Sequence, residues 1–137
     1  RPTLRRHTPN LQNLRPPFST YIWFMDTALT WTEFEKTKMR VGRVVEVKPF
    51  PEAHNPAYII RVDFGSHIGI KKTSAQLTER YAPEALIGKH IIGVVNFAPK
   101  QIGPILSEFL ILGALNGNLG TAVLEVPTDV PLGSPVS

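Results

Sequence analysis

The stretch of sequence that decides the fold is residues 71–81, KKTSAQLTERY. Two lysines and short polar side chains close a segment, residues 67–73, that we expect to be extended. Residues 77–82 are expected to form a short helix, which Pro83 would stop because proline lacks an N–H and clashes with the preceding turn. A strand followed at once by a short helix is therefore predicted near the middle of the chain.

The sequence before this stretch is typical of β-strands separated by turns. Residues 58–64 alternate, with Arg61 and Asp63 on one face and four apolar side chains on the other: Tyr58, Ile60, Val62 and Phe64. Residues 39–48 predict another strand, and the prolines of residues 50–56 predict a loop between the two. Thr32, Glu33 and Glu35 predict a short helical turn with acidic residues near its start.

Further strands are predicted after the short helix. Residues 90–97 are apolar on both faces, which is typical of a central strand covered on both sides. Residues 109–112 and 122–126 are further candidates. Several short strands, one short helix and no long crossover helix favour a small closed barrel over a parallel α/β sheet. OB-folds and SH3-like barrels both have this pattern.

Three glycines are predicted to have structural roles. Gly42 lies inside a strand pattern and is expected at a bulge or a tight bend. We expect Gly65 to take a positive φ in a turn and Gly88 to end the helical region.

The composition argues for a binding protein and against an enzyme. The 137 residues suit one domain and contain no cysteine, which excludes disulfides and thiolate chemistry. The four histidines have no metal-ligand spacing, and no phosphate-binding loop or nucleophile elbow is present. We therefore predict no catalysis, no metal and no cofactor.

The net charge of +4 has an uneven origin. Residues 1–24 hold Arg1, Arg5, Arg6 and Arg15 and no acidic residue, which leaves 11 Lys and Arg against the 11 Asp and Glu of residues 25–137. The sequence pI of about 9.6 therefore reflects the N-terminal segment. A phosphate-binding surface on the neutral remainder would need local clustering of its cations.

Residues 1–24 are predicted to be a separate basic extension, with the domain in residues 25–137. Prolines at positions 2, 9, 16 and 17 disfavour a regular element, and the aromatic segment 18–24 is shorter than the roughly 20 residues of a membrane span. This segment is either an upstream or cloned leader, a basic arm that adds RNA affinity, or a tail whose aromatic end packs on the domain or a partner subunit.

Several short pieces of the chain resemble one family when they are taken in order. They are residues 39–44 (MRVGRV), 74–76 (SAQ), 96–100 (NFAPK) and 107–108 (SE). Together they resemble the small OB-fold tRNA-binding domain in its free-standing form, the CsaA-type secretion chaperone. The resemblance covers roughly residues 33–132. It implies an all-β fold with one short helix, a five-stranded Greek-key OB barrel with terminal extensions.

The resemblance also implies a surface that binds tRNA or polypeptide. Its predicted residues are Lys71, Lys72, Thr73, Ser74, Gln76, Asn96, Phe97, Lys100, Ser107 and Glu108. Structural alternatives stand beside these roles: Ser74 as a helix N-cap, and Asn96 as a residue that holds a loop. Glu108 would orient a lysine or accept a hydrogen bond from a base, and Phe97 is the aromatic side chain that we single out for stacking.

One loop departs from the family pattern. Relatives attached to synthetases carry several basic residues there, in an N-L-K-P-R-K type sequence, whereas this chain has only Lys100 followed by the largely apolar residues 101–106. Fewer phosphate contacts would weaken RNA binding and its salt dependence. An apolar loop suits unfolded polypeptide better.

We therefore predict a cytoplasmic, homodimeric, export-related chaperone that binds unfolded or preprotein polypeptides and does not insert into membranes. The alternative is a dedicated tRNA-binding protein that recognises the outer corner of tRNA by its shape. An assembly module without a ligand is a third reading. Trp31 and Phe34 are predicted at the dimer interface, and their alternative role is to plug the end of their own barrel.

Overall fold

The structure is a computed structural model, and it describes residues 27–137. The predicted extension, residues 1–24, lies outside the described residues. The chain divides into two compact units, residues 1–36 and residues 37–137. Within the described range, no helix is long and apolar enough to cross a membrane.

The described part of the first unit contains the short helix α2 (Trp31–Glu35). Its N-cap is Thr30, whose side-chain oxygen accepts from the Glu33 N–H at 3.1 Å, while Glu33 Oε1 accepts from the Thr30 N–H at 3.0 Å. This reciprocal pair satisfies two helix N-terminal donors. The backbone hydrogen bond from Thr30, and then the bond from its hydroxyl, lower the pKa of Glu33. The predicted helical turn with an acidic start is confirmed.

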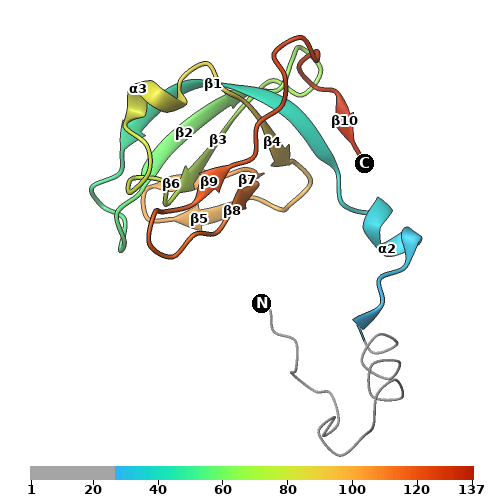
Figure 1. The fold of residues 1–137 in the computed structure, drawn as a ribbon, viewed down its shortest axis with the longest axis horizontal. Coiled ribbons are helices and arrows are strands. Elements are labelled where there is room, and N and C mark those ends of the chain that lie inside the picture. The colour runs from blue at the N-terminus through green and yellow to red at the C-terminus, as the bar shows by residue number, and fades with distance from the viewer. Residues whose placement is uncertain (1–26) are drawn as a thin grey trace, which may run out of the picture. The chain divides into compact units, whose positions relative to one another are not determined.

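The second unit is built around one curled antiparallel sheet (Figure 1). Its strands follow the order β3-β2-β1-β4-β7, and β10 pairs with the start of β1. Two hairpins, β5 with β6 and β8 with β9, and the short helix α3 complete the unit. The bounds are β1 (Met39–Pro49), β2 (Tyr58–Asp63), β3 (Ile70–Ala75), α3 (Pro83–Leu86), β4 (His90–Val94), β5 (Lys100–Ile102), β6 (Ile105–Ser107), β7 (Leu110–Ile111), β8 (Gly113–Ala114), β9 (Ala122–Val123) and β10 (Pro135–Val136).

The long strand β1 bends so that it belongs to both sides of the barrel. Its first half, as far as Arg43, pairs with β4, and its second half pairs with β2. The register shifts between Val44 and Glu46, which places the bulge after Gly42 rather than at it. Gly42 instead permits a close approach, since a Cβ there would stand 2.4 Å from Cγ1 of Val62.

The barrel is nearly closed between β3 and the chain that enters β7. Glu108 N donates to the Lys72 carbonyl at 2.8 Å, which joins these two edges through the backbone. A mostly-β barrel closed in this way, with only short helices, confirms the predicted OB-like fold.

The core fills the inside of this barrel. The four side chains predicted to face inward from residues 58–64 are all buried, while Arg61 on the other face is exposed. Phe64 meets Phe109 edge to face, with ring centroids 5.0 Å apart. A smaller cluster of Phe50, Ala57 and Ile105 packs the β5–β6 hairpin against the outside of the sheet.

The structure corrects the predicted helix of residues 77–82. That segment makes a single turn, closed by a hydrogen bond from Tyr81 N to the Leu77 carbonyl at 3.1 Å. The helix begins at Pro83 instead of stopping there, because the fixed φ and missing N–H of proline suit the first helical position. Gly88 follows the helix with φ 92°, and Gly65 has φ 95°, so both glycine predictions are confirmed.

The predicted strand of residues 67–73 is shifted along the chain. Residues 66–68 form a turn, and β3 runs from Ile70 to Ala75. The two lysines therefore lie inside a strand rather than at its end.

Candidate binding surface

Three of the predicted binding residues form hydrogen bonds that close the barrel. The hydroxyls of Thr73 and Ser107 lie 2.8 Å apart, and Thr73 is only 3% exposed. Glu108 Oε1 accepts from the Lys72 N–H at 2.8 Å. These side chains hold β3 against the end of β6, so their polar atoms are engaged within the fold.

Asn96 has the loop-holding contact that was one of its two predicted roles. Its Oδ1 accepts from the Lys38 N–H at 3.0 Å and ties the end of β4 to the start of β1. Phe97 beside it is 57% exposed, while Phe50, Tyr58, Phe64 and Phe109 are buried. Lys100 is exposed and lies opposite Ser107 in the β5–β6 hairpin.

The prediction that Ser74 caps a helix is wrong. Ser74 is a strand residue paired with Ile59, and the N-cap position of α3 is Ala82, which makes no side-chain cap. Ser74 and Gln76 instead line a pocket of about 460 Å³.

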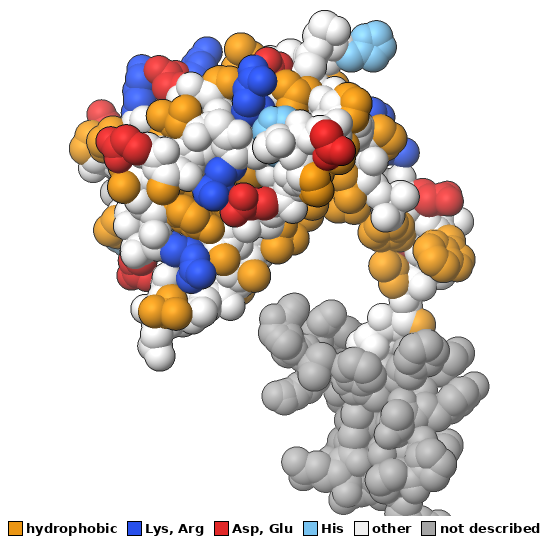
Figure 2. Space-filling view, turned by 45° about the horizontal axis from the view of Figure 1, so that its top comes forward, with side chains coloured by type: hydrophobic (Ala, Val, Ile, Leu, Met, Phe, Trp, Pro, Cys, Tyr) orange, Lys and Arg blue, Asp and Glu red, His pale blue; other side chains and the backbone are white. Residues whose placement is uncertain are grey.

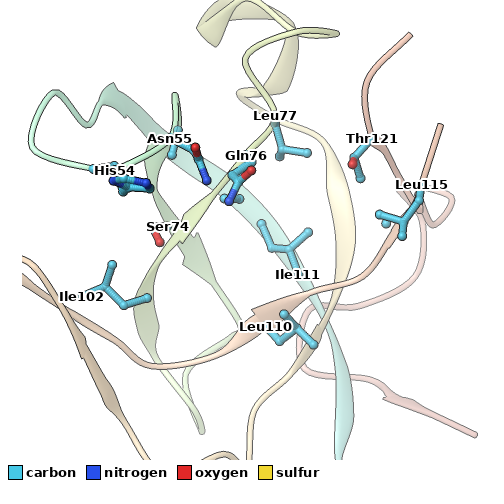
Figure 3. Close-up of a pocket in the computed structure, with 14 residues that line it drawn as sticks. His54, Asn55, Ser74, Gln76, Leu77, Ile102, Leu110, Ile111, Leu115 and Thr121 are labelled. Carbon is cyan, nitrogen blue, oxygen red and sulfur yellow. The ribbon is translucent and has the colours of Figure 1, made fainter. Parts of the chain in front are cut away.

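This pocket, which we call the apolar pocket, is lined by both polar and apolar side chains (Figure 3). The polar side chains come from the β1–β2 loop and the end of β3: His54, Asn55, Ser74 and Gln76. Apolar side chains come from β5, from β7 and from the loop after β8: Ile102, Leu110, Ile111 and Leu115. None of the described residues that line it is Lys, Arg, Asp or Glu. It can therefore take an uncharged apolar group and offer amide hydrogen bonds beside it.

Sequence reasoning missed most of the residues that line this pocket. His54 and Asn55 were assigned only to a loop, and Leu110 and Ile111 only to a strand. One signal was available: Leu115 and Leu119 stand among turn-forming residues in ALNGNLG and are 88% and 63% exposed. Such apolar side chains in a polar loop indicate a surface made for contact.

The surface charges are mixed. Figure 2 shows basic and acidic side chains interspersed over one face of the barrel, with no broad area of one sign. Several cations are paired: Arg61 and Lys48 each lie within 3.4 Å of Glu46, and Lys89 lies 3.0 Å from Glu125. Exposed pairs of this kind add little stability, but they reduce the positive field available to phosphate.

Comparison with known proteins identifies the family. The family model described as "Putative tRNA binding domain" matches residues 39–135. The chain belongs to this family. The match covers the whole barrel, from the first strand to β10, and it confirms the resemblance found in the sequence.

Members of this family occur both within large enzymes and as separate chains. A methionine–tRNA ligase from Pyrococcus horikoshii is 36% identical over 104 residues, 76% of this chain but 14% of the ligase. The match to the ligase from Nanoarchaeum equitans is 35% identical over 108 residues, 79% of this chain and 13% of the ligase. The chain thus spans about one seventh of the ligases it matches.

Two similar solved structures match over nearly their full length. The CsaA chaperone protein from Picrophilus torridus is 44% identical, with a TM-score of 0.74 over 80% of this chain and 99% of that one. CsaA from Bacillus anthracis is 37% identical, with a TM-score of 0.75 over 81% and 100%. The fold and the family are therefore those of CsaA-like proteins with a tRNA-binding-type domain.

Proposed function

We propose that this protein is a CsaA-type chaperone that binds unfolded or preprotein polypeptides in the apolar pocket. The observation that carries the proposal is the lining of that pocket, where aliphatic side chains face carboxamides and no described residue bears a formal charge. An unfolded polypeptide offers the matching chemistry, because its apolar side chains seek burial and its backbone amides seek partners.

The same lining argues against phosphate as the main ligand of the pocket. Binding of nucleic acid depends on lysines and arginines that neutralise phosphates, and none lines this pocket. Of the predicted lysines, Lys72 shares its strand face with Arg61, and Lys100 lies on the hairpin next to the pocket. RNA would therefore contact the surface around Lys72 and Lys100 rather than the pocket itself.

The test compares two exposed leucines of one loop. Leu115→Asp places a carboxylate on the pocket lining, and Leu119→Asp places one on the same loop outside it. We expect Leu115→Asp to weaken binding of a fluorescently labelled, permanently unfolded polypeptide at least tenfold by anisotropy, and Leu119→Asp to change it less than threefold. Equal loss in both variants, or in neither, would remove the pocket from the proposal.

Dedicated tRNA binding is the second candidate, and it is favoured by the family match and by the ligase relatives. Labelled tRNA should be titrated against the full chain at several salt concentrations, with the four N-terminal arginines replaced by serine in a parallel variant. Binding that survives this replacement and is lost in Lys72→Glu or Lys100→Glu would support the tRNA reading. Binding lost with the arginines would assign it to residues 1–24.

The proposal includes a cytoplasmic homodimer that functions in protein export, by binding rather than by catalysis. Trp31 is 81% exposed on α2, and Phe34 lies on the same helix. A dimer would offer two pockets to one polypeptide and increase avidity without new contacts. Light scattering should give twice the monomer mass, and Trp31→Ser with Phe34→Ser should reduce it. If the protein bound neither unfolded polypeptide nor tRNA, the remaining hypothesis would be an assembly module without a ligand.

A further inference from the structure

A second cavity, of about 370 Å³, lies in the barrel unit and shares no lining residue with the apolar pocket. Four segments that are distant in sequence form it: the start of β1, the β2–β3 turn, the chain after β4 and the turn before β10. The lining residues are Lys38, Arg40, Phe64, Gly65, Ser66, His67, Ile68, Val95, Asn96, Leu132 and Gly133. We call it the basic pocket.

Positive charge dominates this lining. Lys38 and Arg40 contribute two cations, His67 adds a third group that can donate, and no Asp or Glu is among the described lining residues. The Arg40 guanidinium is partly buried and donates from Nη1 to the Gly133 carbonyl at 3.0 Å. None of these three side chains forms an ion pair within residues 27–137.

The nearest acidic residue in the β2–β3 segment is engaged elsewhere. Asp63 Oδ1 accepts from the Gly65 N–H at 2.8 Å, and its Oδ2 lies 3.8 Å from Arg43. A partly buried guanidinium without a carboxylate partner is costly unless an anion completes it. The concave shape further concentrates the positive field on the cavity.

The walls of the basic pocket are fixed by close backbone packing. Gly133 has φ 88°, and a Cβ there would stand 2.8 Å from the Phe64 carbonyl oxygen. Gly65 has φ 95°, and a Cβ there would stand 3.0 Å from the Leu132 carbonyl oxygen. The Gly133 N–H also donates to the Val41 carbonyl at 2.7 Å. A site built in advance loses less conformational entropy when a ligand binds.

We propose that the basic pocket binds a small organic anion, through a phosphate or carboxylate group held by Arg40 and Lys38. A guanidinium recognises both groups through paired N–H donors. The volume of about 370 Å³ exceeds what the anionic group alone needs, and Ile68, Val95 and Leu132 offer an apolar wall for the remainder of the molecule. This site is independent of the proposed polypeptide binding.

The test is a titration of the full chain followed by ¹H–¹⁵N NMR in low salt. The probes are phenyl phosphate, phenylacetate, inorganic phosphate and, as a neutral control, benzyl alcohol. We expect saturable shifts of the Ser66 and His67 amides with at least one aromatic anion. Lys38→Gln and Arg40→Gln should each weaken this binding at least fivefold, and Arg61→Gln on another face should change it less than twofold.

Each outcome bears on the proposal. Binding of phenyl phosphate alone, or of phenylacetate alone, supports it and identifies the anionic group. Equal shifts with benzyl alcohol would overturn it, because the cavity would then be only apolar. Absence of saturation for every anion would overturn it too. Lys38→Gln guards against loss of fold, because the Lys38 side chain makes no hydrogen bond or ion pair within residues 27–137, whereas the Arg40 side chain holds the Gly133 carbonyl.

Discussion

Replacing Glu108 should weaken the closure of the barrel between β3 and the chain that enters β7. Glu108 holds Lys72 twice: its backbone N–H donates to the Lys72 carbonyl, and its Oε1 accepts from the Lys72 N–H, both at 2.8 Å. Glu108→Ala removes the second bond and leaves the Lys72 N–H without its acceptor. Glu108→Gln keeps an oxygen in the same position and removes only the charge.

The expected magnitude follows from the type of hydrogen bond. A bond to a charged group contributes about 1.5–3 kcal/mol, and a neutral one about 0.5–1.5 kcal/mol. Glu108 is partly buried rather than fully buried, which favours the lower half of the first range. We therefore expect Glu108→Ala to lower the free energy of unfolding by about 2 kcal/mol and Glu108→Gln by about 1 kcal/mol. For a barrel unit that spans residues 37–137, a loss of about 2 kcal/mol corresponds to a Tm decrease of roughly 9 °C.

Urea and thermal unfolding of the two variants would test this reasoning, with Glu52→Ala as the matched control. Glu52 is exposed in the β1–β2 loop, and such substitutions change stability by about 0.5 kcal/mol or less. A loss in Glu108→Ala no larger than in the control would refute the structural role. Unchanged stability together with lost tRNA or polypeptide binding would assign Glu108 to the ligand instead.

Three further perturbations follow from the described contacts. Gly42→Ala should destabilise the barrel by about 1–3 kcal/mol in urea unfolding, because its methyl group would stand 2.4 Å from Val62 Cγ1; an unchanged midpoint would contradict this. Tyr81→Phe should cost roughly 1–3 kcal/mol, since the Val123 N–H loses its hydroxyl acceptor at 3.0 Å, and thermal unfolding should show it; a Tm equal to wild type would argue that water replaces the hydroxyl. The pKa of Glu33 is lowered, so its capping contribution to stability is fully present above the ordinary glutamate pKa of about 4.3 and is lost as the pH falls through the lowered value. An NMR titration of the Glu33 carboxyl would measure this pKa, and an ordinary value would exclude the capping box in solution.

The strands and their buried faces could be predicted from the sequence because their pattern is local, whereas the choice of an OB-fold among small barrels came from the family resemblance. The alternation through residues 58–64 specifies which side chains face the core, and those four side chains are buried. Pro83 shows the limit of local rules. Proline both stops a helix and begins one, and the sequence does not say which use applies until the preceding turn is known.

The candidate binding surface was less predictable, because it depends on the register of the strands and on how the barrel closes between β3 and β6. Whether Thr73 faces a ligand or Ser107 is decided by how β3 meets β6, across 34 residues of chain. Likewise, the pocket residues His54 and Leu115 come from two loops, and no periodic pattern in the sequence predicts that these loops lie close together. The family resemblance predicted a set of binding residues, and it could not distinguish side chains free to bind a ligand from those that close the barrel, such as Thr73 and Ser107.

The side chains left for a ligand limit how strongly salt can act on RNA binding. Among the ten predicted residues only the three lysines are cationic and can neutralise phosphates, and Thr73, Ser107 and Glu108 are engaged within the barrel. Three phosphate contacts give a slope of about −2.7 in log K against log salt, or roughly a 40-fold loss between 50 and 200 mM salt. Six to ten contacts would give about 10³–10⁵-fold. A loss near 40-fold would fit phosphate contacts by these three lysines alone. A larger loss requires further cations, such as the arginines of residues 1–24, or Arg61, which lies opposite Lys72 in the sheet.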